Sequence, residues 1–234
     1  MNKFEEDLSR TIARIGERYG KDVACKLEGM YKKLCRLYEA NMVKINHSVM
    51  EIVCAADLIA KGYEVDVEYR LNEILTCDVY GVKGDGDLII EIETGFVPPE
   101  HALDPNTYLF ARVASKIARY SAFAKKFGIG TPPHNIVKVP YVFLKPPRDR
   151  GEEDVLRIKR ICDLYYTKPP ISFEEILNAR LYMLYVIDVE SVTVNELSPQ
   201  EYYEIMSHIA KITNASSFGD GGPPYQGILR GLTP

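Results

Sequence analysis

The sequence predicts an α/β fold: a central mixed β-sheet with a three-strand meander, flanked by helices, with an N-terminal helical extension. Three observations support this. Apolar residues recur every three or four positions through the first sixty residues, as in amphipathic helices. The period switches to two at Tyr63, and the later segments follow the order helix, strand, helix.

The composition is that of an ordinary globular protein. The chain has 234 residues, 46% of them hydrophobic and 26% charged. No apolar run approaches the roughly 18 residues of a membrane span, and the N-terminus is too polar for a signal peptide, so we expect a cytoplasmic protein with no membrane partner. The five cysteines are odd in number and lack CxxC spacing, which favours buried free thiols over disulfides or a zinc site.

Two helices are expected in the N-terminal extension, residues 1–45. The first carries Phe4, Leu8, Ile12 and Ile15, and the second, from 21 to 45, carries a narrow apolar seam. The seam could pack on the first helix or on a second copy of itself in a homodimer. The pattern is shorter than three to four heptads, which favours packing within one chain.

The main α/β domain is predicted over residues 46–213, followed by a flexible Gly/Pro-rich tail over 214–234. After a helix at 49–60, the first part of the domain is expected to contain strands at 63–71, 74–83 and 87–94, a helix at 106–127 and a strand at 136–144. The second part is expected to contain a helix at 152–165, a short helix capped by Ser172 and Glu175, a last strand at 182–189 and a last helix at 199–212.

The hairpin within residues 77–95 carries the candidate site. If Asp85 and Gly86 are its two turn residues, Asp78 faces Glu93 and lies diagonal to Glu91. A three-residue loop would send Asp78 to the opposite face. The apolar residues of the two strands share a face only in the first case, so burial of that face should gather the three carboxylates on the other.

Three clustered carboxylates repel one another, and a divalent cation would offset that cost. Mg²⁺ (or Mn²⁺) suits such a site, because it binds one or two carboxylates and keeps several waters. The alternative is a solvated acidic strand face with no special purpose. The segment GVKGDGD is a turn rather than a phosphate loop, because it lacks the Gly-Lys-Ser/Thr ending.

Asp78 on one strand, Glu91-Ile92-Glu93 on the next, and a helix on either side resemble the core of the PD-(D/E)XK nuclease superfamily, with its restriction-endonuclease-like fold. Archaeal Holliday-junction resolvases belong to this superfamily. The resemblance covers roughly residues 46–145. It implies that Asp78 and Glu91 are metal ligands and that the Ile92 carbonyl is a third.

Glu93 departs from the family pattern, which normally has lysine at that position. The resemblance implies that Glu93 is an extra ligand or a base, and that Lys116, on the following helix, replaces the missing lysine. Lys116 shares a helical face with Arg112 and Arg119, which could equally be a solvated basic stripe.

Glu51 has two interpretations that do not exclude each other. Ser48 and Glu51 fit a capping box, which would start the helix at 49. By the resemblance, a glutamate on this first core helix is catalytic. The four histidines show no metal-ligand spacing, so no chemistry is assigned to them.

The net charge of −4 does not by itself suggest a nucleic-acid partner. Eleven of the Asp and Glu residues lie within 62–104, however, and leave the rest of the chain basic. A basic cluster interleaved with aromatic residues could track phosphates or serve only solubility; its members are Lys138, Lys145, Arg148, Arg150, Arg157, Lys159 and Arg160.

The sequence therefore predicts a metal-dependent nuclease that hydrolyses DNA phosphodiester bonds with a metal-activated water. Its catalytic residues would be Asp78, Glu91, Glu93, Lys116 and Glu51. The alternative is an inactive nuclease-like subunit that binds DNA or serves in assembly, which the absence of lysine at position 93 favours.

Overall fold

The computed structural model describes residues 2–212, and its contacts divide the chain into two compact units. Of the described residues, the first unit contains 2–94, 123–135 and 185–196, and the second contains 95–122, 136–184 and 197–212. The predicted tail, 214–234, lies outside the described residues.

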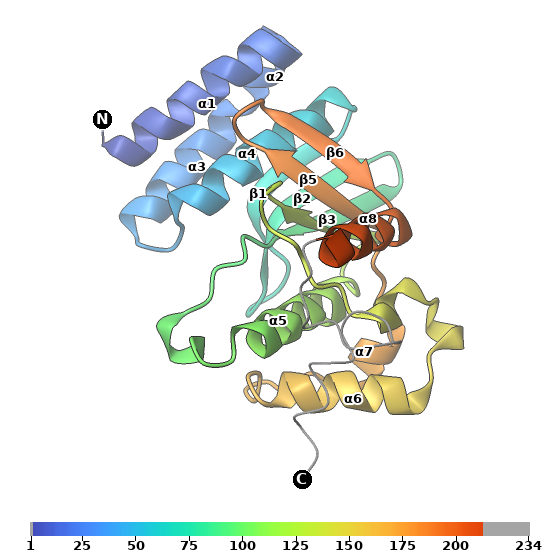
Figure 1. Ribbon diagram of the computed structural model, residues 1–234. Coiled ribbons are helices and arrows are strands. Elements are labelled where there is room, and N and C mark those ends of the chain that lie inside the picture. The colour runs from blue at the N-terminus through green and yellow to red at the C-terminus, as the bar shows by residue number, and fades with distance from the viewer. Residues whose placement is uncertain (1, 213–234) are drawn as a thin grey trace. The chain divides into compact units, whose positions relative to one another are not determined.

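Figure 1 labels the elements along the chain. The helices are α1 (Lys3–Tyr19), α2 (Lys21–Lys26), α3 (Glu28–Glu39), α4 (Ile45–Ala60), α5 (Pro105–Tyr120), α6 (Glu152–Asp163), α7 (Phe173–Asn178) and α8 (Pro199–Ile212). The strands are β1 (Glu64–Arg70), β2 (Thr76–Lys83), β3 (Gly86–Ile92), β4 (Lys126–Thr131), β5 (Met183–Asp188) and β6 (Thr193–Leu197). Short 3-10 turns lie at Pro99–His101, Tyr141–Leu144 and Pro147–Asp149.

The six strands form one mixed sheet in the order β1-β2-β3-β4-β5-β6. The first three strands pair antiparallel as a meander, and β4 pairs parallel with β3. A parallel neighbour requires a crossover connection, and the segment between β3 and β4 contains α5. The predicted α/β class, with its meander in a mixed sheet flanked by helices, is confirmed.

The strand after α5 lies elsewhere than predicted. Residues 126–131 form β4, where a helix to 127 was expected, and the expected strand 136–144 is irregular chain ending in a 3-10 turn after Pro140. Gly130 explains part of this error, because a Cβ there would lie 2.8 Å from Ile187 Cδ1. A side chain at this position would displace the end of the Ile187 side chain, and a buried glycine carries no apolar signal of burial.

The sheet also has one strand more than expected, because β6 follows β5. In the turn between them, the Asp188 carboxylate accepts hydrogen bonds from the backbone N–H groups of Glu190 and Ser191 and from the Ser191 hydroxyl. An aspartate that bonds the backbone two residues on is typical of tight turns.

The N-terminal helices belong to the same unit as the sheet. The expected helix 21–45 is broken at Leu27 into α2 and α3, and α1 packs on all three of the helices that follow it. Leu8, Ile15 and Leu34 are completely buried. The apolar seam is thus covered within the chain, as the shorter heptad pattern favoured.

In the second unit, α5, α6 and α7 pack on one another, and the buried Arg150 side chain ties the adjoining loop to α7. Its guanidinium donates hydrogen bonds to four backbone carbonyls, those of Val142, Lys145, Ile176 and Leu177. Across residues 2–212, every helix is too short or too polar to cross a membrane.

Candidate metal centre

The β2–β3 hairpin turns through Gly84 and Asp85, because Lys83 pairs with Gly86 and Val79 with Ile90. Gly84 has a positive φ of 58°, which glycine adopts without strain. The predicted parity is confirmed, but the predicted partners are wrong by two residues. Continuing the observed register sets Asp78 opposite Glu91, instead of Glu93.

At that point the ladder between the strands is replaced by a pair of side-chain hydrogen bonds. The Asp78 backbone N–H donates to Glu91 Oε1 at 3.2 Å, and the Ile92 backbone N–H donates to Asp78 Oδ2 at 2.5 Å. Each carboxylate is therefore held by the backbone of the opposite strand. Charge-assisted bonds of this kind fix the direction in which a carboxylate points.

Glu91 on β3 and Glu93, just after its end, are buried more deeply than an acidic strand face in water would be. Glu91 is 3% exposed and Glu93 is 1% exposed. Beside them, burial raises the pKa of the Cys77 thiol, and the charges of Glu91 and Asp78 raise it further. These values exclude the solvated acidic face that the sequence left open for this strand.

Helix α4 begins earlier than the sequence predicted, and this moves Glu51 into the helix interior. Lys44 is the N-cap residue and provides no side-chain hydrogen bond, whereas Ser48 is buried within the helix. The predicted capping box of Ser48 and Glu51 is therefore wrong. Glu51 itself is completely buried, which is unusual for a glutamate that does not serve in a polar site.

His47 and Glu51 lie one helical turn apart on α4 and meet Asp78 from the hairpin. One potential ligand atom from each of His47, Glu51 and Asp78 lies within 4.8 Å of the other two. Around an octahedral ion with bonds of about 2.1 Å, neighbouring donor atoms lie roughly 3 Å apart and opposite ones roughly 4 Å. The three side chains could therefore hold a divalent cation if their donor atoms drew closer together.

Two of the predicted site residues meet in this group of three: Asp78, which was predicted as a ligand, and Glu51, which was predicted as a catalytic residue. Glu91 is joined to Asp78 by the hydrogen bond described above but is not one of the three, and neither are Glu93 and Ile92. The Glu93 backbone continues along β4, donating its N–H to the Gly130 carbonyl at 2.7 Å. Lys116 lies on α5, in the second unit, and its role stays a prediction.

His47 is the residue that the sequence reasoning missed. With the helix expected to start at 49, His47 fell in a loop and its spacing from Glu51 carried no meaning. Once α4 starts at Ile45, the two side chains at i and i+4 share a face of the helix. The signal was present in the sequence as His-x-x-x-Glu.

The basic cluster predicted from the sequence is largely engaged in local contacts. Lys159 pairs with Asp163, Lys145 with Asp154 and Arg148 with Asp149. The Lys138 ammonium donates to the Asn106 side-chain oxygen, and burial lowers the pKa of Lys138. Arg150 is itself a buried structural residue, as described above. These contacts therefore support a structural role for the basic cluster over a role in tracking phosphates.

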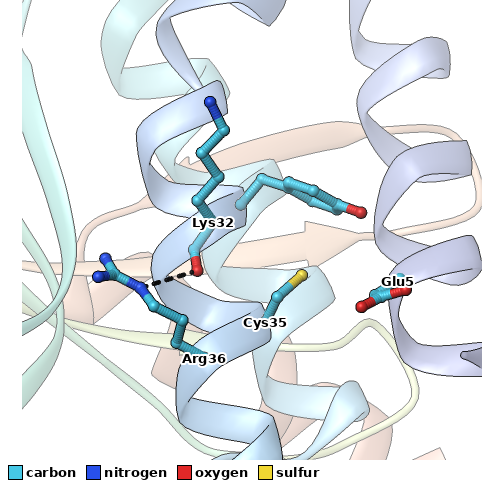
Figure 2. Close-up of a pocket in the computed structure, with 5 residues that line it drawn as sticks. Glu5, Lys32, Cys35 and Arg36 are labelled. Atoms are coloured by element: carbon cyan, nitrogen blue, oxygen red, sulfur yellow. Dashed lines mark hydrogen bonds between the residues drawn. The ribbon is translucent and has the colours of Figure 1, made fainter. Parts of the chain in front are cut away.

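A separate cavity of about 480 Å³ opens among the N-terminal helices (Figure 2). Glu5 comes from α1, and Lys32, Cys35 and Arg36 come from α3; the Arg36 Nε–H donates to the Lys32 carbonyl at 3.3 Å. It shares no residue with the group of His47, Glu51 and Asp78. Burial raises the pKa of Cys35, so this thiol is not an activated nucleophile.

Comparison with known proteins adds no family to this geometry: no family model, curated protein or solved structure matches the chain.

Proposed function

We propose that the protein is a metal-dependent nuclease that hydrolyses DNA phosphodiester bonds, acting in the cytoplasm. The observation that carries this proposal is the meeting of His47, Glu51 and Asp78 within 4.8 Å, beside the buried Glu91. The order of the elements along the chain supports it, because α4, the acidic β2–β3 hairpin, α5 and β4 follow one another in the sequence expected from the PD-(D/E)XK resemblance.

A divalent cation bound here would polarise the scissile phosphate and lower the pKa of a bound water. The protein's own contribution is to hold the ligands in place before the cation arrives. Glu51 is fixed within a helix, and Asp78 is fixed by the Ile92 N–H. Ligands that need not reorganise leave more of the binding energy available for catalysis.

In this proposal, Glu91 and Glu93 would act as bases toward the attacking water or as further ligands of the cation. Glu91 accepts a hydrogen bond from the Asp78 N–H through Oε1, and its carboxylate would receive a proton from the water or act as a further ligand. Glu93 stands where the resemblance expects lysine, and it would act as a further ligand or as a base. Lys116 would stabilise the negative charge that develops on the phosphate.

A second candidate is an inactive nuclease-like subunit that binds DNA or serves in assembly. The buried glutamate at position 93 is the observation that favours it, because lysine there balances phosphate charge in most members of the superfamily. Binding of DNA without cleavage, in the presence of either metal, is the result expected from this alternative.

A cleavage assay tests the proposal directly. Labelled duplex, single-stranded and branched DNA, with RNA in parallel, would be incubated with the protein in MgCl₂, in MnCl₂ and in EDTA. We expect cleavage of at least one DNA substrate that EDTA abolishes. The Asp78→Asn variant should lose about 100-fold or more, since metal stabilisation contributes several kcal/mol and each 1.36 kcal/mol is a factor of ten.

Asp85→Asn is the matched control, because Asp85 lies exposed in the turn of the same hairpin. It should cleave at the parental rate. Equal cleavage by the Asp78→Asn variant and the parent would show that another site performs the reaction, and cleavage in EDTA would refute metal dependence.

A further inference from the structure

One of the three side chains that meet at the candidate centre offers nitrogen, and the other two offer oxygen. His47 contributes a ring nitrogen, whereas Glu51 and Asp78 contribute carboxylate oxygens. A site built only for Mg²⁺ has no use for the imidazole, because Mg²⁺ is a hard ion that takes oxygen ligands and gives up its waters reluctantly. Imidazole instead favours first-row transition metals.

We propose that this centre binds a first-row transition ion, such as Mn²⁺ or Co²⁺, in preference to Mg²⁺, and that His47 is the ligand that discriminates between them. The inference rests on the metal centre of the proposed function. It adds that the nitrogen donor, rather than the carboxylates, determines which cation is bound.

The backbone around His47 supports a fixed donor. His47 lies in the first turn of α4, and its N–H donates to the Lys44 carbonyl at 3.1 Å. Its side chain is half-buried, and Glu51 one turn later is completely buried. Because the helix holds the imidazole ring at the site, a cation that binds imidazole poorly loses one of the three protein ligands.

The other histidines that the structure describes have different surroundings. His101 stacks on Tyr108 at 4.2 Å, and the His208 ring contacts the Glu204 carbonyl on its own helix. His134 is exposed in the loop after β4, in the same unit as His47. It is the matched control, since its substitution removes an imidazole without touching the site.

Isothermal titration of the metal-free protein with MnCl₂, CoCl₂ and MgCl₂, in the absence of DNA, tests the inference. We expect the dissociation constant for Mn²⁺ to be at least about tenfold below that for Mg²⁺, and that for Co²⁺ to be lower still. In the His47→Gln variant, the Mn²⁺ and Co²⁺ constants should rise about tenfold or more. The Mg²⁺ constant should stay within about threefold, and His134→Gln should match the parent.

A second variant and an NMR spectrum distinguish loss of the His47 ligand from loss of the fold. His47→Asp replaces nitrogen by oxygen and should shift the preference toward Mg²⁺. In the parent, Co²⁺ should broaden or shift the ring signals of His47 in the NMR spectrum and leave those of His134 unchanged. Circular dichroism would confirm that both His47 variants are folded.

Failure of this inference is distinguishable from failure of the proposed function. Equal or tighter binding of Mg²⁺ by the parent, an equal loss of both classes of ion in His47→Gln, or no binding of any ion would overturn the inference. Transition-metal binding through His47 without any DNA cleavage would uphold it and refute the nuclease.

Discussion

Asp78 and Glu91 hold each other across the β2–β3 hairpin: the Asp78 N–H donates to Glu91 Oε1, and the Asp78 carboxylate accepts from the N–H of the residue that follows Glu91. Two carboxylates on directly opposed residues of neighbouring strands repel each other, and Glu91 is almost completely buried. The hairpin thus carries an electrostatic cost that a bound cation would relieve.

Removing one negative charge should stabilise the metal-free protein. In the Glu91→Gln variant, the amide oxygen can still accept from the Asp78 N–H while the repulsion is lost. We expect an unfolding free energy higher by about 1 kcal/mol, seen as a melting temperature about 2–4 °C higher. The stabilisation that MnCl₂ gives the parent should shrink in the variant.

Glu64→Gln on β1 is the control, because Glu64 is exposed. Differential scanning calorimetry in EDTA and in MnCl₂ makes both comparisons. A lower melting temperature for Glu91→Gln in EDTA would contradict the view that its charge is a cost.

The Arg150 clamp should be essential to the second unit. Arg150 is 8% exposed, and its planar guanidinium reaches carbonyls from two segments, which an ammonium group cannot do. We expect Arg150→Lys to lower the unfolding free energy by about 2 kcal/mol or more, since several carbonyls lose their donors. Urea unfolding followed by circular dichroism measures this.

Arg148→Lys provides the comparison from the same loop, because the Arg148 side chain is exposed. It should change stability by less than about 0.5 kcal/mol. Equal effects of the two substitutions would show that the Arg150 hydrogen bonds contribute little.

The β5–β6 turn should respond to acid through Asp188. The hydroxyl of Ser191 and the two backbone N–H groups lower the pKa of Asp188 below its usual 3.8. A carboxyl whose pKa is lowered by folding stabilises the folded state above its unfolded pKa, and this contribution is lost as the pH falls through the folded pKa. Carbon-detected NMR titration of the Asp188 carboxyl should therefore give a midpoint below 3.8.

Ser191→Ala removes the hydroxyl and should move the Asp188 midpoint upward, toward the usual value. The Asp163 carboxyl, on α6 in the second unit, is an internal reference for the same spectra. An Asp188 midpoint that is unchanged by Ser191→Ala would assign the shift to the backbone donors alone.

The cysteines should fall into two reactivity classes. Burial raises the pKa of Cys54, Cys77 and Cys162, the last to about 12, whereas Cys25 is exposed. Since the thiolate is the reactive form, Ellman's reagent at pH 8 should label Cys25 rapidly and Cys35 slowly. The other three should react only after unfolding.

Mass spectrometry of the labelled peptides identifies the sites, and a Cys25→Ser variant should lose the fast phase. Rapid labelling of Cys77 in the native protein would mean that the hairpin opens readily. The prediction from sequence that all five thiols are buried is already wrong for Cys25, which lies on a six-residue helix without buried side chains.

The sequence by itself determined the class of the fold and the parity of the hairpin. Alternation along β2 and β3 requires their apolar residues to share a face, and this alone sets Asp78 on the same side as Glu91. Alternation has a period of two, however, so a register displaced by two residues satisfies it equally well. Only the turn at Gly84 and Asp85 decided that Asp78 faces Glu91 instead of Glu93.

The tertiary structure alone decided the remaining features of the site. Helix α4 starts at Ile45 without a side-chain cap, so no capping residue marks its start, and the His-x-x-x-Glu spacing of His47 and Glu51 has meaning only once that start is known. Asp78 joins them because α4 packs against β2, a contact between segments that no local pattern encodes. Gly130 in β4 is also buried, with the end of the Ile187 side chain 2.8 Å from where a Cβ would lie, and a glycine gives no apolar signal of that burial.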